Sequence, residues 1–393
     1  VNAAVTAPLN NIAVIAGTRT VAVGGATADG IGSVALGAGA SAKLNGAAAF
    51  GSGAAADGNN AIAISANAKA TGGKAIAIGS DANASVADAL AFGHAANASA
   101  SDAVALGHLV NATAANATAI GGFANANAES AVAIGRTAVV SKDRGIAIGE
   151  NANVTSNGTN GTAVGVSAVA NGTNSTAIGH LARGGYIDSI ALGTNANASN
   201  LQTISIGKDT VNGAISGTAI GTGASIGGWA DNAIAIGTGA AVDGASGSSK
   251  GNNAIAMGMT AKANKESSIA IGRESNTAGN YGLAIGRNAN ASTTEENAIA
   301  LGRNTVAGRD SAIAVGLGAQ ATGQFSQAVG RYANSSGSSA LAMGVSANAS
   351  GSNTLAMGES ANASGNDALA MGVSTKASWS EALAMGKGAN ASG

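Results

Sequence analysis

The stretch that decides the fold is residues 75–79, which read Ala-Ile-Ala-Ile-Gly, and copies of this stretch return along the whole chain. Residues 131–135 read Ala-Val-Ala-Ile-Gly, and residues 382–386 read Ala-Leu-Ala-Met-Gly. Counted by their closing residue, the copies number 26, and Ser65 is the one closing residue that is not glycine. Of the 25 steps between closing residues, 20 are 14 residues long. A fixed period of this kind indicates a solenoid, in which each unit stacks on its neighbours.

Within each copy the apolar residues alternate with period 2, which is typical of a β-strand and not of a coiled coil. A glycine in every copy also disfavours a helix. The other half of the unit often reads Ala-Asn-Ala-Ser, as at residues 82–85 and 347–350. This half predicts a second short strand with alanine on one face and polar residues on the other. Two strands and two turns in 14 residues predict one coil of a narrow, parallel, all-β solenoid.

The composition excludes an ordinary globular core. Hydrophobic residues make up 46% of the 393 residues, but aromatic residues make up only 2%, and large aromatic side chains normally dominate core burial. The 19 basic residues nearly balance the 20 acidic ones, so the charge indicates neither a nucleic-acid partner nor an anionic membrane surface. There is no cysteine, which excludes disulfides and thiol chemistry and suits an exported protein.

The predicted first strand has two apolar faces. The residue before the closing residue is bulky and apolar in all 26 copies, and the central residue is Ala in 25 of them. We interpret the bulky face as the interior of the coil and the small face as a seam for self-association, because small residues allow close approach of another backbone. The seam candidates are Ala77, Ala105, Ala133, Ala147, Ala163 and Ala270. Two alternatives stay open: the faces are reversed, with Ile and Val at the seam, or the alanines face water.

The ends and interruptions of the repeat predict the domain organisation. Residues 1–20 hold the only proline and a degenerate copy, and we expect them to form an N-terminal cap or degenerate coil, because solenoid ends expose unpaired edges. Residues 21–393 are expected to form the repetitive roll, with about 26 coils and loop insertions near 150–164, 222–236, 238–257 and 287–301. The first residues carry no signal-peptide pattern, so the sequence is expected to be a mature protein or a fragment.

Two residues of the insertions are candidate contact residues for a partner, namely Trp229 and Lys250. Insertions in repeat proteins often lie on the binding face, and Trp is enriched among residues that dominate binding. The alternative for Trp229 is that its ring covers a bent turn.

Residues able to carry out chemistry are few. The histidines are His94, His108 and His180, and each follows a closing glycine. His94 and His108 are expected to stack on adjacent coils about 5 Å apart, where they form either a pair of metal ligands or, as we prefer, a surface polar ladder. No catalytic triad or phosphate-binding loop can be assembled, so we expect no cofactor, no metal and no enzyme activity.

Triplets of the form Asn-x-Ser/Thr are frequent, and such triplets accept N-linked sugars in exported proteins. The simpler interpretation is that Ala-Asn-Ala-Ser is the repeat of the second strand. The triplets begin at Asn83, Asn97, Asn111, Asn116, Asn153, Asn157, Asn160, Asn171, Asn174, Asn197, Asn290, Asn334, Asn348, Asn362 and Asn390.

Residues 33–37, Ser-Val-Ala-Leu-Gly, and residues 268–272, Ser-Ile-Ala-Ile-Gly, resemble the first half of the head repeat of the YadA-like trimeric autotransporter adhesins. Ala347, Ala349 and Gly351 match its second half, and the resemblance covers roughly residues 21–393. It implies a left-handed parallel β-roll, three chains around one axis, a place on the outer membrane surface of Gram-negative bacteria, and virulence-related adhesion. The implied partners are extracellular matrix proteins or cell-surface receptors. That family's neck, stalk and membrane anchor are not visible in this sequence, so no membrane contact is expected of this part.

Three functions compete on the sequence alone. The first is a bacterial cell-surface adhesin head that binds host matrix or other cells through a repetitive polar surface. The second is a structural spacer or filament-forming surface protein without a specific ligand. The third is an ice-binding or polysaccharide-binding solenoid, which needs regular rows of Thr or aromatic residues that are not present in register.

Overall fold

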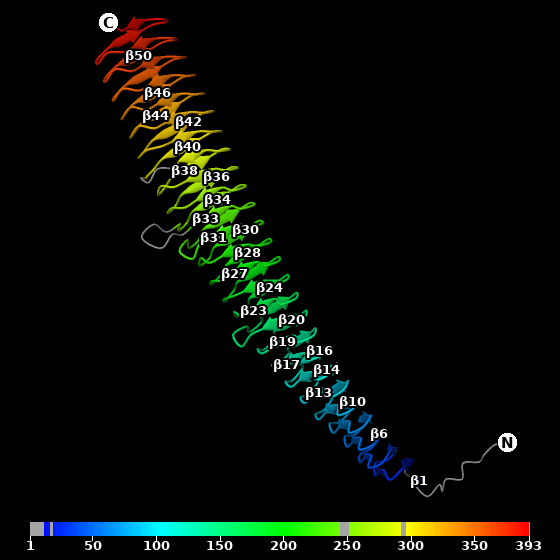
Figure 1. The fold of residues 1–393 in the computed structure, drawn as a ribbon. Coiled ribbons are helices and arrows are strands. Elements are labelled where there is room, and N and C mark those ends of the chain that lie inside the picture. Colours follow the sequence, from blue (N-terminus) through cyan, green and yellow to red (C-terminus); the bar gives the residue numbers. More distant parts are fainter. Residues whose placement is uncertain (1–11, 16–18, 244–250, 292–295, 393) are drawn as a thin grey trace, which may run out of the picture. The chain divides into compact units, whose positions relative to one another are not determined.

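A computed structural model describes residues 12–15, 19–243, 251–291 and 296–392, with side chains from residue 19 onward. In these residues every regular element is a β-strand. The chain divides into two compact units, Val1–Asp188 and Ser189–Gly393, each of which is described by itself. In both units three-residue and two-residue strands alternate along the chain, and one of each forms a coil (Figure 1).

In the first unit, β1 (Ile12–Ile15) precedes the coils. The first strands of the coils are β2 (Thr20–Val23), β4 (Val34–Leu36), β6 (Ala48–Phe50), β8 (Ile62–Ile64), β10 (Ile76–Ile78), β12 (Leu90–Phe92), β14 (Val104–Leu106), β16 (Thr118–Ile120), β18 (Val132–Ile134), β20 (Ile146–Ile148), β22 (Thr162–Val164) and β24 (Thr176–Ile178). The second strands are β3 (Thr27–Ala28), β5 (Ser41–Ala42), β7 (Ala55–Ala56), β9 (Lys69–Ala70), β11 (Asn83–Ala84), β13 (Asn97–Ala98), β15 (Asn111–Ala112), β17 (Asn125–Ala126), β19 (Val139–Val140), β21 (Asn153–Val154), β23 (Val169–Ala170) and β25 (Arg183–Gly184).

In the second unit, the first strands are β26 (Ile190–Leu192), β28 (Ile204–Ile206), β30 (Thr218–Ile220), β32 (Ile234–Ile236), β34 (Ile255–Met257), β36 (Ile269–Ile271), β38 (Leu283–Ile285), β40 (Ile299–Leu301), β42 (Ile313–Val315), β44 (Gln327–Val329), β46 (Leu341–Met343), β48 (Leu355–Met357), β50 (Leu369–Met371) and β52 (Leu383–Met385). The second strands are β27 (Asn197–Ala198), β29 (Val211–Asn212), β31 (Ser225–Ile226), β33 (Ala241–Val242), β35 (Lys262–Ala263), β37 (Asn276–Thr277), β39 (Asn290–Ala291), β41 (Val306–Ala307), β43 (Gln320–Ala321), β45 (Asn334–Ser335), β47 (Asn348–Ala349), β49 (Asn362–Ala363), β51 (Lys376–Ala377) and β53 (Asn390–Ala391).

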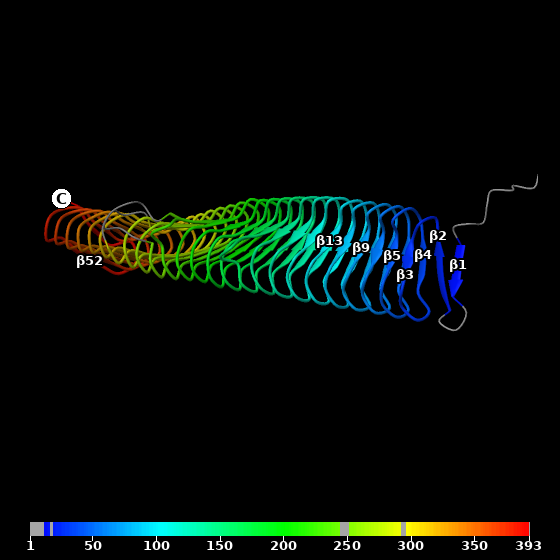
Figure 2. The same ribbon diagram turned by 90° about the horizontal axis from the view of Figure 1, so that it is seen from below.

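Successive coils pair in parallel and in register. In the first unit β10 pairs with β12, so that Ala77 lies beside Ala91, and in the second unit β48 pairs with β50 in the same way. The second strands form their own parallel sheet, in which Asn83 lies beside Asn97. Figure 2 shows the successive coils of each unit side by side. Each position of the repeat therefore forms a continuous row, and the predicted all-β parallel solenoid of 14-residue coils is confirmed.

The first coil is preceded by an antiparallel strand. β1 pairs with β2, and the register joins position 12 with position 23 and position 15 with position 20. The outer edge of β2 is thus hydrogen-bonded, whereas an unpaired edge strand would be a template for association. This pairing agrees with a capping role for the N-terminal residues, which stays a prediction.

The interior of a coil is filled almost entirely by methyl groups. Around β10 and β11 it is made by Ala75, Ala77, Ala82 and Ala84, none of which is exposed. Larger apolar side chains enter the interior of the regular coils only rarely in the described residues, as at Val110 and Val140. The bulky residues of the first strand therefore point outward.

This burial corrects the expected place of the self-association seam. All six predicted seam alanines have 0% exposure in the single chain, so their side chains contact the interior of their own coil and not another chain: Ala77, Ala105, Ala133, Ala147, Ala163 and Ala270. Alternation along the strand was predicted correctly, but the face that points inward was assigned the wrong way round. The reversed assignment, with Ile and Val on the outside, is the observed one.

Where the chain departs from the period, the interior changes with it. Val154 is fully buried before the coil that is two residues longer than the repeat. Room for its side chain comes from glycines, because a Cβ added at Gly145, Gly158 or Gly161 would lie 2.9–3.1 Å from Val154 Cγ1. Ile226 and Val242 are likewise buried beside the longer coils of the second unit. These three longer coils are thus filled by larger apolar residues.

One coil of the second unit, formed by β28 and β29, has two polar side chains in its interior. Ser205 and Asn212 have no exposed surface. Asn212 donates from Nδ2 to the carbonyl of Ile204 at 3.1 Å, and Ser205 donates from Oγ to the carbonyl of Asn197 at 2.8 Å. Both polar groups are therefore satisfied by the backbone, as buried polar groups must be to avoid a large desolvation cost.

Tight turns require two left-handed residues per coil. In the coil after Gly79, Asp81 has a φ of 59° and Asp88 a φ of 58°, and Asp, Asn and Ser tolerate this region better than most residues. Gly79 itself has a φ of 132°. A Cβ on Gly79 would lie 2.4 Å from the carbonyl oxygen of Gly93 in the next coil. Glycine at the end of the first strand is therefore needed both for its conformation and for the close approach of the next coil.

We predict that Gly79→Ala lowers the stability of the protein by roughly 1–3 kcal/mol, because it combines an unfavourable φ with a backbone clash. The matched control is Gly73→Ala, since a Cβ at Gly73 meets no atom within 4 Å. Thermal unfolding followed by circular dichroism measures both variants. Equal midpoints for the two variants would contradict the role assigned to Gly79.

We also predict that Ala133→Leu lowers the stability by about 1–3 kcal/mol, because the coil interior has no room for three further carbon atoms. Ala87→Leu makes the same change at an exposed position and should leave the unfolding midpoint nearly unchanged. Denaturant unfolding compares the two variants. A tolerated Ala133→Leu would show that the interior is wider than its alanine lining indicates.

Candidate functional site

The outward face of the first strands is a row of half-exposed apolar side chains. In the first unit the residue before the closing residue is 37–47% exposed at several coils, namely Ile64, Phe92, Leu106, Ile148 and Ile178. The second unit continues the pattern with Met257, Ile285 and Met343. Contiguous exposed apolar surface of this kind marks an interaction site in soluble proteins. We call this surface the apolar row.

The outward face of the second strands is polar and uncharged over long stretches. In the first unit Asn83 donates from Nδ2 to Asn97 Oδ1 at 2.9 Å, and in the second unit Asn334 and Asn348 form the same bond at 2.8 Å. Asn348 continues it to Asn362 at 2.9 Å. Parallel, in-register strands place identical amides one above the other, and such amide ladders add to the stability of stacked sheets. We call this surface the amide row.

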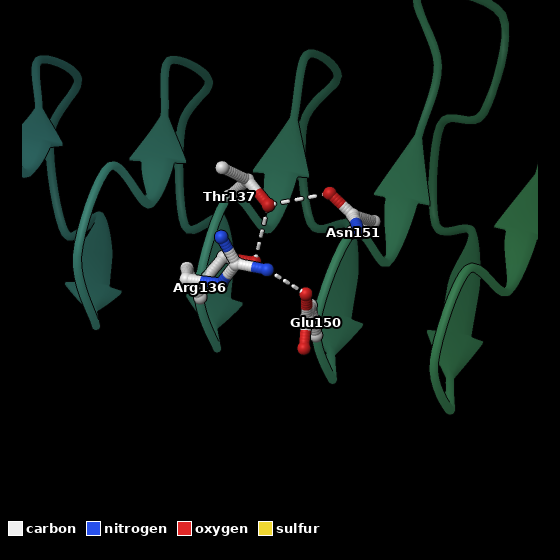
Figure 3. A network of polar contacts seen from close by, with 4 residues as sticks. All are labelled: Arg136, Thr137, Glu150 and Asn151. Carbon is white, nitrogen blue, oxygen red and sulfur yellow. Dashed lines mark hydrogen bonds and ion pairs between the residues drawn. The ribbon is translucent and has the colours of Figure 1, made fainter.

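The turns of several coils carry charged side chains that bridge successive coils. On the first turn, Arg136 forms an ion pair with Glu150, and Thr137 donates a hydrogen bond to Asn151 Oδ1 (Figure 3). On the second turn, the Lys43 ammonium donates to Asp57 at 2.7 Å, which raises the pKa of Lys43 above its ordinary value. Exposed pairs of this kind contribute little to stability. Their effect is to keep the turn surface close to neutral.

The predicted stacking of histidines is observed. The rings of His94 and His108 lie 5.2 Å apart and nearly parallel, and His108 meets Phe123 edge-on at 5.2 Å. Within the residues that the structure describes, no group of three or more His, Cys, Asp or Glu side chains is placed to hold a metal ion. Through these ring contacts His94, His108 and Phe123 form an aromatic ladder on the first turn.

The second turn of the first unit is hollowed beside the longer coil. The hollow has a volume of about 550 Å³, and the longer turn between β21 and β22 forms one of its walls. Its lining includes Lys142, Asn157, Thr159, Thr173 and Tyr186. Gly172 lies against the next coil, because a Cβ there would be 1.9 Å from the carbonyl carbon of Tyr186. The 16-residue step and the paired Asn-Gly-Thr triplets are the sequence signals that could have located this hollow, which the sequence analysis did not single out.

The two predicted loop contacts differ in what can be said of them. Trp229 is 55% exposed, on the longer turn between β31 and β32. Lys250 lies outside the described residues. Their role in binding stays a prediction. In the part of the chain that the structure describes, no helix could cross a membrane.

Comparison with known proteins identifies the repeat. The chain matches the family described as YadA head domain repeat, over stretches that together cover well over half of its length: residues 16–40, 66–82, 70–93, 87–108, 112–138, 126–152, 156–182, 187–210, 249–275, 278–305, 294–319, 307–333, 335–361 and 349–375. No curated protein sequence matches the chain.

Among solved structures, the chain is similar to the collagen-binding domain of the Yersinia adhesin YadA. The identity is 21%, the match covers 53% of this chain and 69% of that chain, and the TM-score is 0.16. The family match alone identifies the chain, because it follows the repeat from the first coil almost to the last. The chain belongs to the YadA head domain repeat family and is an adhesin-like head.

Proposed function

We propose that this chain is the head of a homotrimeric adhesin that binds a multivalent partner, such as an extracellular matrix protein or the receptors of another cell. The observation that carries the proposal is the division of the coil surface, within each unit, into an apolar row, which Gln327 interrupts in the second unit, and several polar rows. The apolar row suits association between copies of the chain, and the polar rows remain available to a partner. YadA-like adhesins are exposed on the outer membrane of Gram-negative bacteria, and we assign this chain to the same place.

The apolar row supports self-association. Its side chains are half-buried or exposed in the single chain, as at Ile134 and Ile148, and burying apolar surface contributes roughly 25 cal/mol per Å². This favourable free energy recurs from coil to coil, so its sum over a long row is large even though each coil contributes little. Three chains around one axis, as the resemblance implies, would cover the row of each chain.

The polar rows support binding that is distributed along the coils. The amide row is uncharged over long stretches, between the exposed Lys69, Arg183, Lys262 and Lys376, and many of its donors and acceptors satisfy one another. Such a surface offers shallow contacts and not the deep apolar pockets that small ligands require. Many weak contacts along the coils, multiplied by three chains, give strong overall binding through avidity. The alternative is a structural spacer, which would present the same surface without a specific partner.

We predict that Ile134→Glu combined with Ile148→Glu dissociates the oligomer, because each carboxylate would be unpaired and costly to desolvate at the apolar row. The single chain should keep its β-sheet circular dichroism spectrum, since both side chains point outward. The control pair, Ala87→Glu and Ser101→Glu, adds the same charge at exposed second-turn positions. Analytical ultracentrifugation gives the mass of each variant. A trimer of unchanged stability in the first variant would exclude the apolar row as the seam.

We predict that adhesion to fibrillar collagen or to intact animal cells falls gradually as whole coils are removed. Deletions of residues 80–93, 94–107 and both together preserve the register, because each removes one complete period. Binding is measured by surface plasmon resonance and cell attachment. Abrupt loss with one segment, or with Trp229→Ala alone, would instead indicate a local site. A full-length head that binds neither surface would favour the spacer.

A further inference from the structure

The Asn-x-Ser/Thr triplets fall into distinct classes once their surroundings are known. Most of their asparagines lie on second strands, in the amide row, and are only partly exposed. Asn83 and Asn97, for example, hydrogen-bond through their side-chain amides to the next coil. Neighbours in this row are one strand spacing of about 4.8 Å apart, which leaves little width for a sugar ring on each coil. These positions are therefore poor acceptors for a covalent sugar.

The triplets that begin in the second turn and end in a first strand are restricted in another way. Asn160 accepts from Arg144 Nε at 2.8 Å and donates to Asn174 Oδ1 at 2.9 Å, and Asn174 donates in turn to Asp188 at 2.9 Å. Their hydroxyl residues, Thr162 and Thr176, belong to β22 and β24 and lie on the apolar row. The triplet of Asn116 likewise ends in a first strand, because its hydroxyl residue, Thr118, belongs to β16. The asparagines of these triplets are exposed, but the hydroxyl residue of each lies within a first strand.

Asn157 differs from all of these positions. Like Asn116, Asn160 and Asn174 it is exposed, but its whole triplet, with Gly158 and Thr159, lies inside the turn that is longer than the repeat. No hydrogen bond joins its side-chain amide to another residue of the described chain, and only its carbonyl is engaged, accepting from Thr173 Oγ1 at 3.2 Å. The next triplet shows the contrast, because Asn171 donates to the carbonyl of Gly185 at 3.0 Å and accepts from Thr155 at 2.6 Å.

The surroundings of Asn157 also leave room for an attached group. The hollow of about 550 Å³ begins at Asn157 and Thr159 and extends to Tyr186, whose side chain is 54% exposed. An exposed aromatic ring beside hydroxyl and amide groups offers both an apolar face and hydrogen-bonding partners. A sugar on Asn157 would enter this hollow without displacing any strand.

We propose that Asn157 is an N-glycosylation site of this head. In the transfer step the Asn157 Nδ2 forms a bond to the anomeric carbon of a sugar that is activated by a diphosphate group. The bond from that carbon to the diphosphate oxygen breaks, the diphosphate leaves with the electron pair, and one Nδ2 proton passes to a base of the transferase. The step involves no oxidation or reduction. The proposal does not depend on what the head binds or on its oligomeric state.

The test is peptide mass spectrometry of the full chain purified from the cells that produce it. We expect the peptide containing Asn157 to carry a sugar mass, and Asn157→Gln and Thr159→Ala each to abolish it. Thr159→Ser preserves the triplet and should retain the sugar, and Asn83→Gln, in the amide row, should leave the Asn157 sugar unchanged. Circular dichroism confirms that each variant is folded.

Three results would overturn the assignment. The first is an unmodified Asn157 peptide in the wild-type protein. The second is a sugar that persists in Asn157→Gln, because it would then be linked to a hydroxyl and not to the amide. The third is equal modification of Asn83, Asn97 and Asn157, since exposure of the amide would then have no part in selecting the acceptor.

Discussion

The close stacking of identical coils is the constraint on which the rest of the structure depends. Each coil closes in about 14 residues and lies one strand spacing from the next, roughly 4.8 Å. This geometry leaves an interior the width of two methyl groups, so alanine fills it at nearly every coil. It also brings Gly79 so near the backbone of Gly93 that no side chain fits between them. Composition, turn residues and the outward position of Ile and Val all follow from this one spacing.

Most of the fold could be predicted from the sequence because the same pattern of residues recurs in coil after coil. Period-2 alternation predicted the strands, and the Ala-Asn-Ala-Ser segment predicted the second strand that is observed at β11 and β47. The stacking of His94 on His108 followed from the register alone. These features depend on spacing along the chain, which the sequence displays directly.

The inward face of the first strand could not be predicted in the same way. Alternation shows that Ala77 lies opposite Ile76 and Ile78, but not which side is enclosed. That choice depends on the distance between the two strands of a coil, which is set by the turns. The usual rule that large apolar side chains are buried led to the wrong face here, because the enclosed space is too thin for them. The hollow beside Asn157 was missed for a related reason: it depends on a longer turn lying over neighbouring glycines.

The room that Gly145 leaves for Val154 has a consequence for how the chain finds its native pairing. A sequence of nearly identical coils invites misalignment, since a slip by one whole period places alanine beside alanine and costs little. A slip at β21 would instead bring Val154 against a coil with alanine at the position of Gly145, such as Ala131, and a Cβ at Gly145 would lie 2.9 Å from Val154 Cγ1. Overpacking of this kind is destabilising. The irregular coils thus distinguish otherwise interchangeable segments and favour one native alignment.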